Sequence, residues 1–283
     1  MKQKVKAYSE LMKLRLSSLV IFSSFFGYMI APGEIIWMQI LWLSIGGALV
    51  TGAANSFNQI IEKDLDKIME RTQKRPLPDN RLTVKGAFIF SAIIALIGVG
   101  SLLMVNILCA SLGILAMALY VFAYTPLKRV TPLSVFVGAI PGSFPPMLGY
   151  VAATASFGLE AGVLFAVQFF WQFPHFWAIA WKLNDDYLKA GFKMLPSLGG
   201  RDKKSAFQIM LYTAMMLPMG TMPYMVGMTT VYSVPLVLLL TMPMLVYSVR
   251  LYLTLDMKFA IKVMFASFYY LPLVLIIYLV TKN

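Results

Sequence analysis

Nine long apolar runs take up most of the 283 residues and restrict what this chain can fold into. They cover approximately residues 16–32, 35–57, 84–104, 107–124, 131–154, 161–181, 206–228, 232–249 and 260–280. A helix needs about 20 apolar residues to cross the hydrocarbon core of a bilayer. Because every backbone polar group in that core must be bonded internally, such runs are expected to be helical. The sequence therefore predicts an all-α, polytopic membrane protein with nine transmembrane helices.

The composition agrees with a membrane environment. Charged residues make up 13% of the chain, whereas soluble domains average about 25%. The first run follows a lysine-rich segment, but Ile30-Ala31-Pro32-Gly33 is a poor signal-peptide cleavage site, so we expect that run to be retained as a helix. The single cysteine, Cys109, cannot form an internal disulfide. We expect residues 1–283 to form one integral-membrane domain.

The 24 Lys and Arg residues lie almost entirely on one side of the predicted membrane. With nine crossings, the N-terminal segment shares a side with the loops after the second, fourth, sixth and eighth helices. All Lys and Arg residues except Lys282 fall in these segments. Since positive loops stay in the cytoplasm, we expect a bacterial inner-membrane protein with a cytoplasmic N-terminus and an outside C-terminus. The net charge of +12 then reflects orientation and contact with the lipid bilayer, with no nucleic acid partner.

Acidic residues gather in the loops after the second and sixth helices, which orientation rules do not require. In the first cluster, Asn58, Glu62 and Asp66 are four residues apart, so on a continuing helix they share one face. Three oxygen-bearing groups near the end of an apolar helix suit Mg²⁺, which binds carboxylates and substrate phosphate. The alternative is a solvated helix end with ion pairs, which we favour for Glu70. Asp64 is expected to face water or a lysine.

A second acidic cluster, Asp185 and Asp186, follows the sixth helix on the same side. Between the clusters the fourth helix ends in Tyr124, Lys128 and Arg129, which either hold phosphate oxygens or anchor the helix at the interface. Acidic loops with cations between them form a suitable cradle for a magnesium diphosphate. Mg²⁺ and the cations would neutralise charge on the leaving diphosphate as an allylic carbon–oxygen bond breaks. The predicted diphosphate-binding residues are Arg71, Tyr124, Lys128, Arg129 and Lys189.

A secondary transporter is the alternative from a different functional class. Transporters place their binding sites near the bilayer midplane. The middle stretches of the nine runs are almost free of ionisable groups, which disfavours a transporter.

These clusters resemble the motifs of the UbiA superfamily of membrane prenyltransferases. The segment from Asn58 to Asp66 is similar to that superfamily's N-D-x-x-D-x-x-x-D motif, with Gln59 and Glu62 in place of aspartates. Tyr124 to Lys128 is similar to its Y-x-x-x-K element. The Asp185–Asp186 pair matches the second acidic motif in position, although Lys182 stands where a first acid is expected. The resemblance covers nearly the whole chain and implies a UbiA-like bundle with cytoplasmic active-site loops.

Within the superfamily, the chain most resembles the protoheme IX farnesyltransferase family. The shared strings are Met69–Thr72, Arg75–Leu77, Gly138–Gly142, Gln172–Phe176, Asp186–Tyr187, Ala190–Gly191 and Met194–Pro196. Members of that family transfer the farnesyl group of farnesyl diphosphate to a vinyl group of haem B. Water adds at the adjacent carbon and gives haem O. A quinone-precursor prenyltransferase of the same superfamily is the alternative.

The resemblance also implies roles for individual residues. The implied catalytic residues are Asn58, Glu62, Asp66 and Asp186, and these four together with Asp185 are the implied Mg²⁺ ligands. His175, the only histidine, either contacts the haem or satisfies backbone groups freed by Pro174. Lys13 and Arg15 either meet a haem propionate or the diphosphate, or anchor the first helix at the membrane surface.

Overall fold

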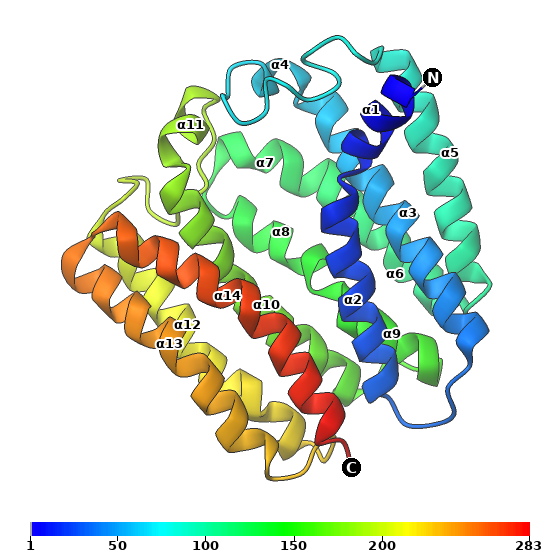
Figure 1. Cartoon of the computed structure of the whole chain (residues 1–283), viewed down its shortest axis with the longest axis vertical. Helices are drawn as coiled ribbons and strands as arrows, with labels where there is room; N and C mark the ends of the chain where they lie inside the picture. Colours follow the sequence, from blue (N-terminus) through cyan, green and yellow to red (C-terminus); the bar gives the residue numbers. More distant parts are fainter. Residues whose placement is uncertain (1) are drawn as a thin grey trace.

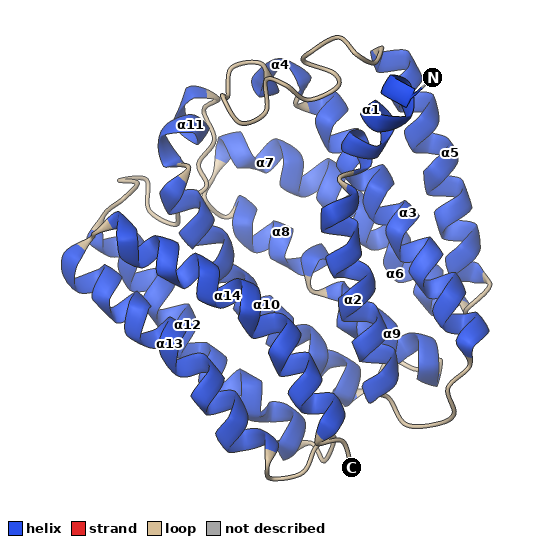
Figure 2. Cartoon of the chain, viewed as in Figure 1, coloured by secondary structure: helices blue, strands red, loops and turns tan. Residues whose placement is uncertain are grey.

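The computed structural model describes residues 2–283, with Lys2 and Arg15 described by their backbone alone. Its regular secondary structure is helical, and loops connect the helices (Figures 1 and 2). The first helices are α1 (Lys2–Met12), α2 (Leu14–Ile30), α3 (Trp37–Ile61), α4 (Lys63–Asp66), α5 (Val84–Leu103), α6 (Ile107–Ala118), η1 (Leu119–Tyr124) and α7 (Thr125–Val130). The others are α8 (Ser134–Gly142), α9 (Phe144–Thr154), α10 (Leu159–Lys182), α11 (Asn184–Lys189), α12 (Lys203–Met225), α13 (Ser233–Thr254) and α14 (Met257–Val280). No β-strand occurs in this range, which confirms the all-α prediction.

The predicted number of nine membrane spans is slightly too high. Seven helical segments between residues 2 and 283 are long and apolar enough to cross a membrane, and the bent pair α1–α2 makes eight. α2 has only 17 residues, so it reaches the required length only together with α1. α12 covers most of the seventh predicted run but is not among these spans, since polar residues and the prolines Pro218 and Pro223 make it less apolar. The chain is nevertheless a multi-pass membrane protein.

The helices pack as two groups (Figure 1). α2, α3, α5, α6 and α9 lie on one side, and α10, α12, α13 and α14 lie on the other. The two groups meet near the C-terminus, where Nζ of Lys282 donates hydrogen bonds to the backbone oxygens of Met29 (3.2 Å) and Ala31 (2.5 Å). These two hydrogen bonds join the end of α2 to the residues that follow α14.

The break between α8 and α9 is stabilised by glutamine side chains from α10. Nε2 of Gln168 donates to the carbonyl oxygen of Gly142 at 2.6 Å, and Nε2 of Gln172 donates to that of Ala139 at 3.0 Å. Backbone groups freed by a break inside a bilayer must find such partners. The prolines and glycines of this span are therefore tolerated because α10 packs against them.

α2 and α9 cross with almost no space between their backbones. A Cβ atom added to Gly149 would lie 1.9 Å from the carbonyl oxygen of Ser24. We expect Gly149→Ala to lower the Tm of the purified protein by about 5 °C, because the helices must move apart. Gly162→Ala is the matched control, since no atom lies within 4 Å of that position and Ala favours a helix by about 1 kcal/mol. Equal Tm values for the two variants in thermal unfolding would contradict this close packing.

Candidate active site

The first acidic segment lies where α3 ends and α4 begins. Glu62 interrupts the helix, yet its N–H donates to the Asn58 carbonyl at 2.9 Å, and the N–H of Asp66 donates to the Glu62 carbonyl at 2.8 Å. The four-residue spacing is therefore kept across the break. All three side chains are buried, and Nδ2 of Asn58 donates to Oγ1 of Thr125 at 3.1 Å. The structure thus places Asn58, Glu62 and Asp66 on one shared face.

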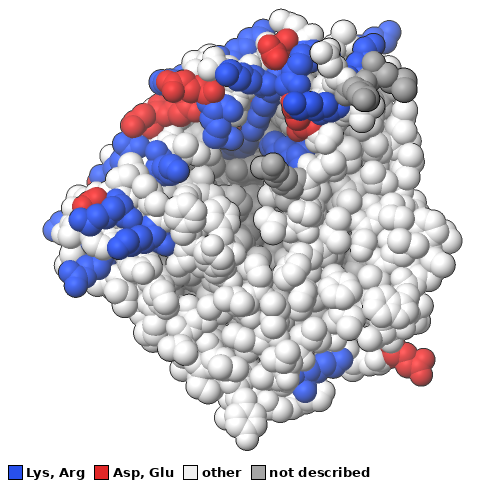
Figure 3. Space-filling view, in the orientation of Figure 1, with Lys and Arg blue, Asp and Glu red and all other residues white. Residues whose placement is uncertain are grey.

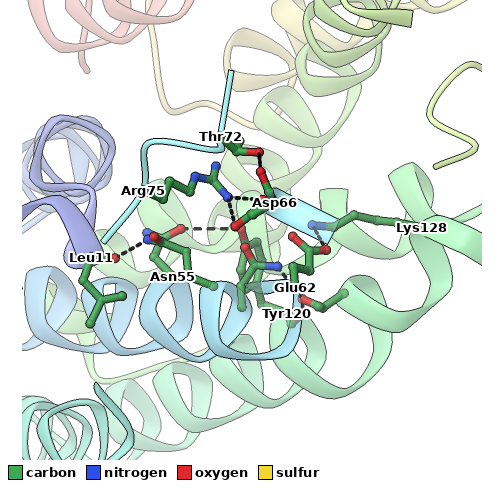
Figure 4. A network of polar contacts seen from close by, with 11 residues as sticks. Leu11, Asn55, Glu62, Asp66, Thr72, Arg75, Tyr120 and Lys128 are labelled. Carbon is green, nitrogen blue, oxygen red and sulfur yellow. Dashed lines mark hydrogen bonds and ion pairs between the residues drawn. The ribbon is translucent and has the colours of Figure 1, made fainter. Parts of the chain in front are cut away.

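Each buried carboxylate of this segment is paired with a cation from another segment (Figure 4). Nη1 of Arg75 contacts both carboxylate oxygens of Asp66, at 2.8 and 2.7 Å. Nζ of Lys128 lies 2.6 Å from Oε1 of Glu62. Burying an ion costs several kcal/mol unless it is paired, so each cation offsets part of the cost of burying its carboxylate. Arg75 lies in one of the strings that carry the family resemblance, but its local sequence predicts no role for it.

A π-helical turn, η1, brings a second set of side chains to the site. The N–H and Oγ1 of Thr125 both donate to the carbonyl oxygen of Tyr120, the hydroxyl at 2.8 Å. The widened turn places the rings of Tyr120 and Tyr124 5.2 Å apart, with Nζ of Lys128 4.7 Å from the Tyr124 ring centroid. Single π-helical turns are frequent at functional sites. The sequence pattern gave no sign of this turn.

The second acidic segment, α11, lies beside the loop that follows α4 (Figure 1). Asp186 accepts hydrogen bonds from the backbone N–H groups of Glu70 (2.9 Å) and Arg71 (3.4 Å). Nζ of Lys189 pairs with Glu70 at 2.5 Å, and the Arg71 guanidinium lies 5.8 Å from the Tyr187 ring centroid. The two acidic loops are therefore joined. The Asp186 carboxylate is bonded to the backbone of the first loop.

Two predicted site residues lie outside this cluster. Asp185 is 75% exposed and pairs with Arg201 at 3.0 Å, and the side chain of Arg129 is exposed. Adjacent residues on a helix point roughly 100° apart, so Asp185 turns away when Asp186 faces the first loop. The expectation that Asp185 joins the metal set is not met in this structure. The side chain of Arg15 falls outside the described residues.

The carboxylates do not form a closed metal site by themselves. Among residues 2–283, no three Asp, Glu, His or Cys side chains lie close enough together to hold a metal ion. The shared face holds only two acids, Glu62 and Asp66, because Asp186 binds the backbone of the first loop and Asp185 pairs with Arg201. One feature still fits a hard cation, since Oε1 of Glu62 is buried and its contact with Lys128 lacks hydrogen-bond geometry. Mg²⁺ uses one or two such carboxylates and completes its shell with water and phosphate.

Lys13 enters the cluster from the junction of α1 and α2. Its backbone is in the left-handed region (φ 52°, ψ 55°), which costs a non-glycine residue roughly 1–2 kcal/mol. Burial, followed by the positive charges of Arg75 and Lys128, lowers the pKa of Lys13 from 10.5 to about 7. Nε2 of Gln59 donates to the Leu11 carbonyl at 2.7 Å and ties α1 to α3. Gln59, which replaces a family aspartate, is thus a structural tie beside the cluster.

A cavity of about 310 Å³ opens beneath the charged residues, and Figure 3 shows the hollow with Lys and Arg side chains around its upper rim. Asn55, Tyr120 and Tyr124 line the part nearest the cluster. Most of the remaining wall is apolar and includes Phe22, Val50, Leu102, Leu112, Met117, Phe144 and Leu148. The cations Lys13, Arg75 and Lys128 lie at one end of this cavity, which we call the mouth. The site therefore joins a cationic mouth to an apolar cavity, which suits a molecule with a charged head and a hydrocarbon tail.

His175 borders the same cavity from α10. Its Nδ1 lies 2.8 Å from Oγ of Ser267 on α14, and its ring stacks on Trp171 with 4.6 Å between ring centroids. No hydrogen bond joins the His175 ring to a backbone group among the described residues, so the ring does not bond directly to a carbonyl freed by Pro174. The described contacts thus give no support to the second interpretation of His175, whose side chain lines the cavity.

Sequence comparison identifies related proteins over the whole chain. The profile of the UbiA prenyltransferase family matches residues 20–271. A protoheme IX farnesyltransferase from Cytophaga hutchinsonii is 45% identical over 284 residues, covering 100% of this chain and 99% of its own. The protein of the same name from Christiangramia forsetii is 46% identical, covering 97% of this chain and 93% of its own.

Solved structures share the fold at low sequence identity. A digeranylgeranylglyceryl phosphate synthase superposes with a TM-score of 0.82 at 20% identity, covering 99% of both chains. A UbiA homolog from Archaeoglobus fulgidus bound to GPP and Mg²⁺ gives 0.65 at 12% identity, covering 96% of this chain and 99% of its own. The predicted UbiA-like bundle is confirmed. With the family profile and the full-length relatives, these matches show that the chain is a membrane prenyltransferase belonging to the UbiA prenyltransferase family.

Proposed function

We propose that this chain transfers the farnesyl group of farnesyl diphosphate to a vinyl group of haem B and so forms haem O. The observation that carries the proposal is a single cavity that reaches from Tyr124, whose ring centroid lies 4.7 Å from Nζ of Lys128, to His175. One end suits a diphosphate, and the other presents aromatic rings and an imidazole. The name of the full-length relatives, protoheme IX farnesyltransferase, supports these two substrates.

Departure of the diphosphate depends on cations already present at the mouth. Lys128, Arg75 and Lys13 lie around the buried acids Glu62 and Asp66. When the prenyl carbon–oxygen bond breaks, negative charge grows on the diphosphate oxygens, and fixed cations lower the energy of that charge. Arg71 and Tyr124 border the same region, while Lys189 is 45% exposed at its edge. We assign weaker contacts with the diphosphate to Arg71, Tyr124 and Lys189.

Mg²⁺ fits the oxygen donors of this site. We assign its ligands to Glu62, Asp66 and the amide oxygen of Asn58, because these groups share one buried face and Mg²⁺ prefers oxygen. The chemistry that Mg²⁺ supplies when bound is neutralisation of the leaving group. Asp186 acts on the site by holding the backbone of Glu70 and Arg71. The solved structure of a family member bound to GPP and Mg²⁺ supports this assignment.

The cavity protects the allylic cation that remains on the farnesyl group. The rings of Tyr120 and Tyr124 line the cavity beside the mouth, and aromatic faces attract cations. The terminal vinyl carbon of haem B forms the new carbon–carbon bond with C1 of the farnesyl group. The adjacent carbon becomes cationic, adds one water molecule and loses a proton. The products are haem O, diphosphate and one proton.

The choice of acceptor can be tested directly. Membranes containing the chain are incubated with haem B, farnesyl diphosphate and Mg²⁺. We expect a product heavier than haem B by one farnesyl and one hydroxyl group, detected by mass spectrometry. An Asp66→Ala membrane preparation is the control for background activity. Unchanged haem B, together with prenylation of a quinone precursor offered in parallel, would assign the chain to the quinone branch of the superfamily.

The membrane placement is also part of the proposal. We infer that the N-terminus and the charged mouth face the cytoplasm and that the C-terminus lies outside, in a bacterial inner membrane. On the face seen in Figure 3, Lys and Arg gather at the end that carries the mouth, and this is the arrangement that positive-inside orientation produces. Farnesyl diphosphate would then enter from the cytoplasm, and the whole of residues 1–283 would act as one domain.

Lys13 should make diphosphate binding take up protons. Its pKa of about 7 in the free protein leaves it mostly neutral at about pH 8, and a bound diphosphate raises that pKa. We expect uptake of about one proton per site at pH 8, falling toward zero below about pH 6, where Lys13 is already protonated. Affinity should accordingly decrease as the pH rises above about 7. Isothermal titration calorimetry in buffers of different ionisation enthalpy measures the uptake. Equal uptake by Lys13→Met and the unmodified protein would contradict this role.

A further inference from the structure

The hydrogen bonds of His175 fix which ring nitrogen carries its proton. Oγ of Ser267 lies 2.6 Å from the carbonyl oxygen of Met264 and donates its single proton there. In its 2.8 Å bond with His175, the Ser267 hydroxyl must therefore be the acceptor, and Nδ1 of His175 must be the donor. A neutral imidazole with a proton on Nδ1 has a free lone pair on Nε2.

The ring is also fixed in orientation. It stacks on Trp171 at an interplanar angle of 18°, and Phe268 meets it edge-on with ring centroids 5.0 Å apart. Nε1 of Trp171 donates to the carbonyl oxygen of Ser267 at 2.9 Å, so both rings are tied to the same residue of α14. Nε2 of His175 has no hydrogen-bond partner among the described side chains and is not among their fully enclosed unpaired atoms. His175 lines the cavity, and Nε2 is the ring nitrogen left without a partner there.

This arrangement is that of a metal-binding histidine. Metal ligands of this type usually donate the other ring N–H to an oxygen, which fixes the tautomer and the direction of the lone pair. Yet no group of three or more Asp, Glu, His or Cys side chains that could hold a metal ion occurs at His175 in the described part of the chain. The surroundings are aromatic and apolar, with Trp171, Phe176, Phe268 and Leu271 lining the cavity. A metal ion bound here would need ligands from its own prosthetic group, as iron has from the four nitrogens of a porphyrin.

We propose that Nε2 of His175 is an axial ligand of the acceptor's haem iron, and that Ser267 is a positioning residue that fixes the imidazole. This inference rests on the proposed function, because it takes haem B as the acceptor. Iron coordination holds the porphyrin at one height in the cavity. His175 lies seven residues before the end of α10 at Lys182, which is about 10 Å along the helix. The porphyrin is thus held below the charged mouth, with its edge free to meet the prenyl carbon.

The test is a titration of the purified protein with haem B, followed by visible absorption and resonance Raman spectroscopy. The unmodified chain should give a spectrum of histidine-ligated haem. We expect His175→Ala to lose this spectrum and to bind haem B about 10- to 100-fold more weakly. Added imidazole should restore the spectrum in His175→Gly. Ser267→Ala should keep the iron–nitrogen band but shift its frequency, because Nδ1 loses its acceptor.

Iron-free protoporphyrin IX separates ligation from packing. If His175 acts through iron, His175→Ala should bind this porphyrin within about two-fold of the unmodified chain. An equal loss of affinity for both porphyrins, or identical haem spectra with and without His175, would overturn the inference. Haem O formation by the unmodified chain distinguishes the two proposals. If haem O forms while the spectra do not depend on His175, only the axial ligand is wrong; if haem B neither binds nor reacts, both proposals fail.

Discussion

Asp66→Asn should reduce prenyl transfer on the order of 1,000-fold, because it removes a negative charge that both positions Arg75 and binds the metal. The Asp66 side chain is fully buried and receives both of its contacts from Nη1 of Arg75. The amide keeps the size of the carboxylate and can still accept one of these hydrogen bonds. Steady-state rates with farnesyl diphosphate and haem B, at saturating Mg²⁺, measure the effect.

Asp64→Asn is the matched control for this variant. Asp64 is two residues earlier in the same short helix, is 73% exposed and pairs only loosely with Lys67 at 3.5 Å. Its substitution should change the rate by less than about two-fold, since exposed pairs contribute little. Thermal unfolding of both variants shows whether lost activity reflects unfolding, because breaking a buried pair costs roughly 3–5 kcal/mol. A folded Asp66→Asn protein with rates close to those of the unmodified chain would exclude Asp66 from the reaction.

Lys128→Met should lower kcat/KM for the prenyl diphosphate by about 100- to 1,000-fold. The Lys128 side chain is 9% exposed and its ammonium group lies between the Glu62 carboxylate and the Tyr124 ring. Because it acts on the diphosphate, the loss should be the same for geranyl and farnesyl diphosphates. Arg129→Met, at the exposed neighbouring position, should change kcat/KM by less than about two-fold. A loss that varies with prenyl length, or that Arg129→Met shares, would place the diphosphate elsewhere.

Local spacing was enough to predict the central acidic face. The four-residue interval from Asn58 to Asp66 survives the break at Glu62, because each N–H still bonds to the carbonyl four residues earlier. The apolar runs likewise predicted the helices, and the boundary between runs 84–104 and 107–124 is where α5 ends and α6 begins. Such features depend on neighbours along the chain, which a sequence displays directly.

Long-range pairing was not predictable in the same way. Nothing in the local pattern of residues 69–77 indicates that Arg75 folds back onto Asp66. The same holds for Lys13, whose position depends on a left-handed backbone at a helix junction. Asp185 and Asp186 are chemically equivalent in sequence, and only the packing of α11 against the first loop decides which one faces it. These choices follow from tertiary contacts.

A structure of the purified chain with Mg²⁺ and a non-hydrolysable thio analogue of farnesyl diphosphate addresses the proposed site most directly. The diphosphate should lie against Lys128, Arg75 and Lys13, with Glu62 and Asp66 on the metal side. The hydrocarbon tail should pass Tyr120 into the cavity that His175 borders. A diphosphate bound away from these residues, with the Asp66–Arg75 and Glu62–Lys128 pairs unchanged and the cavity empty, would contradict the proposed mechanism.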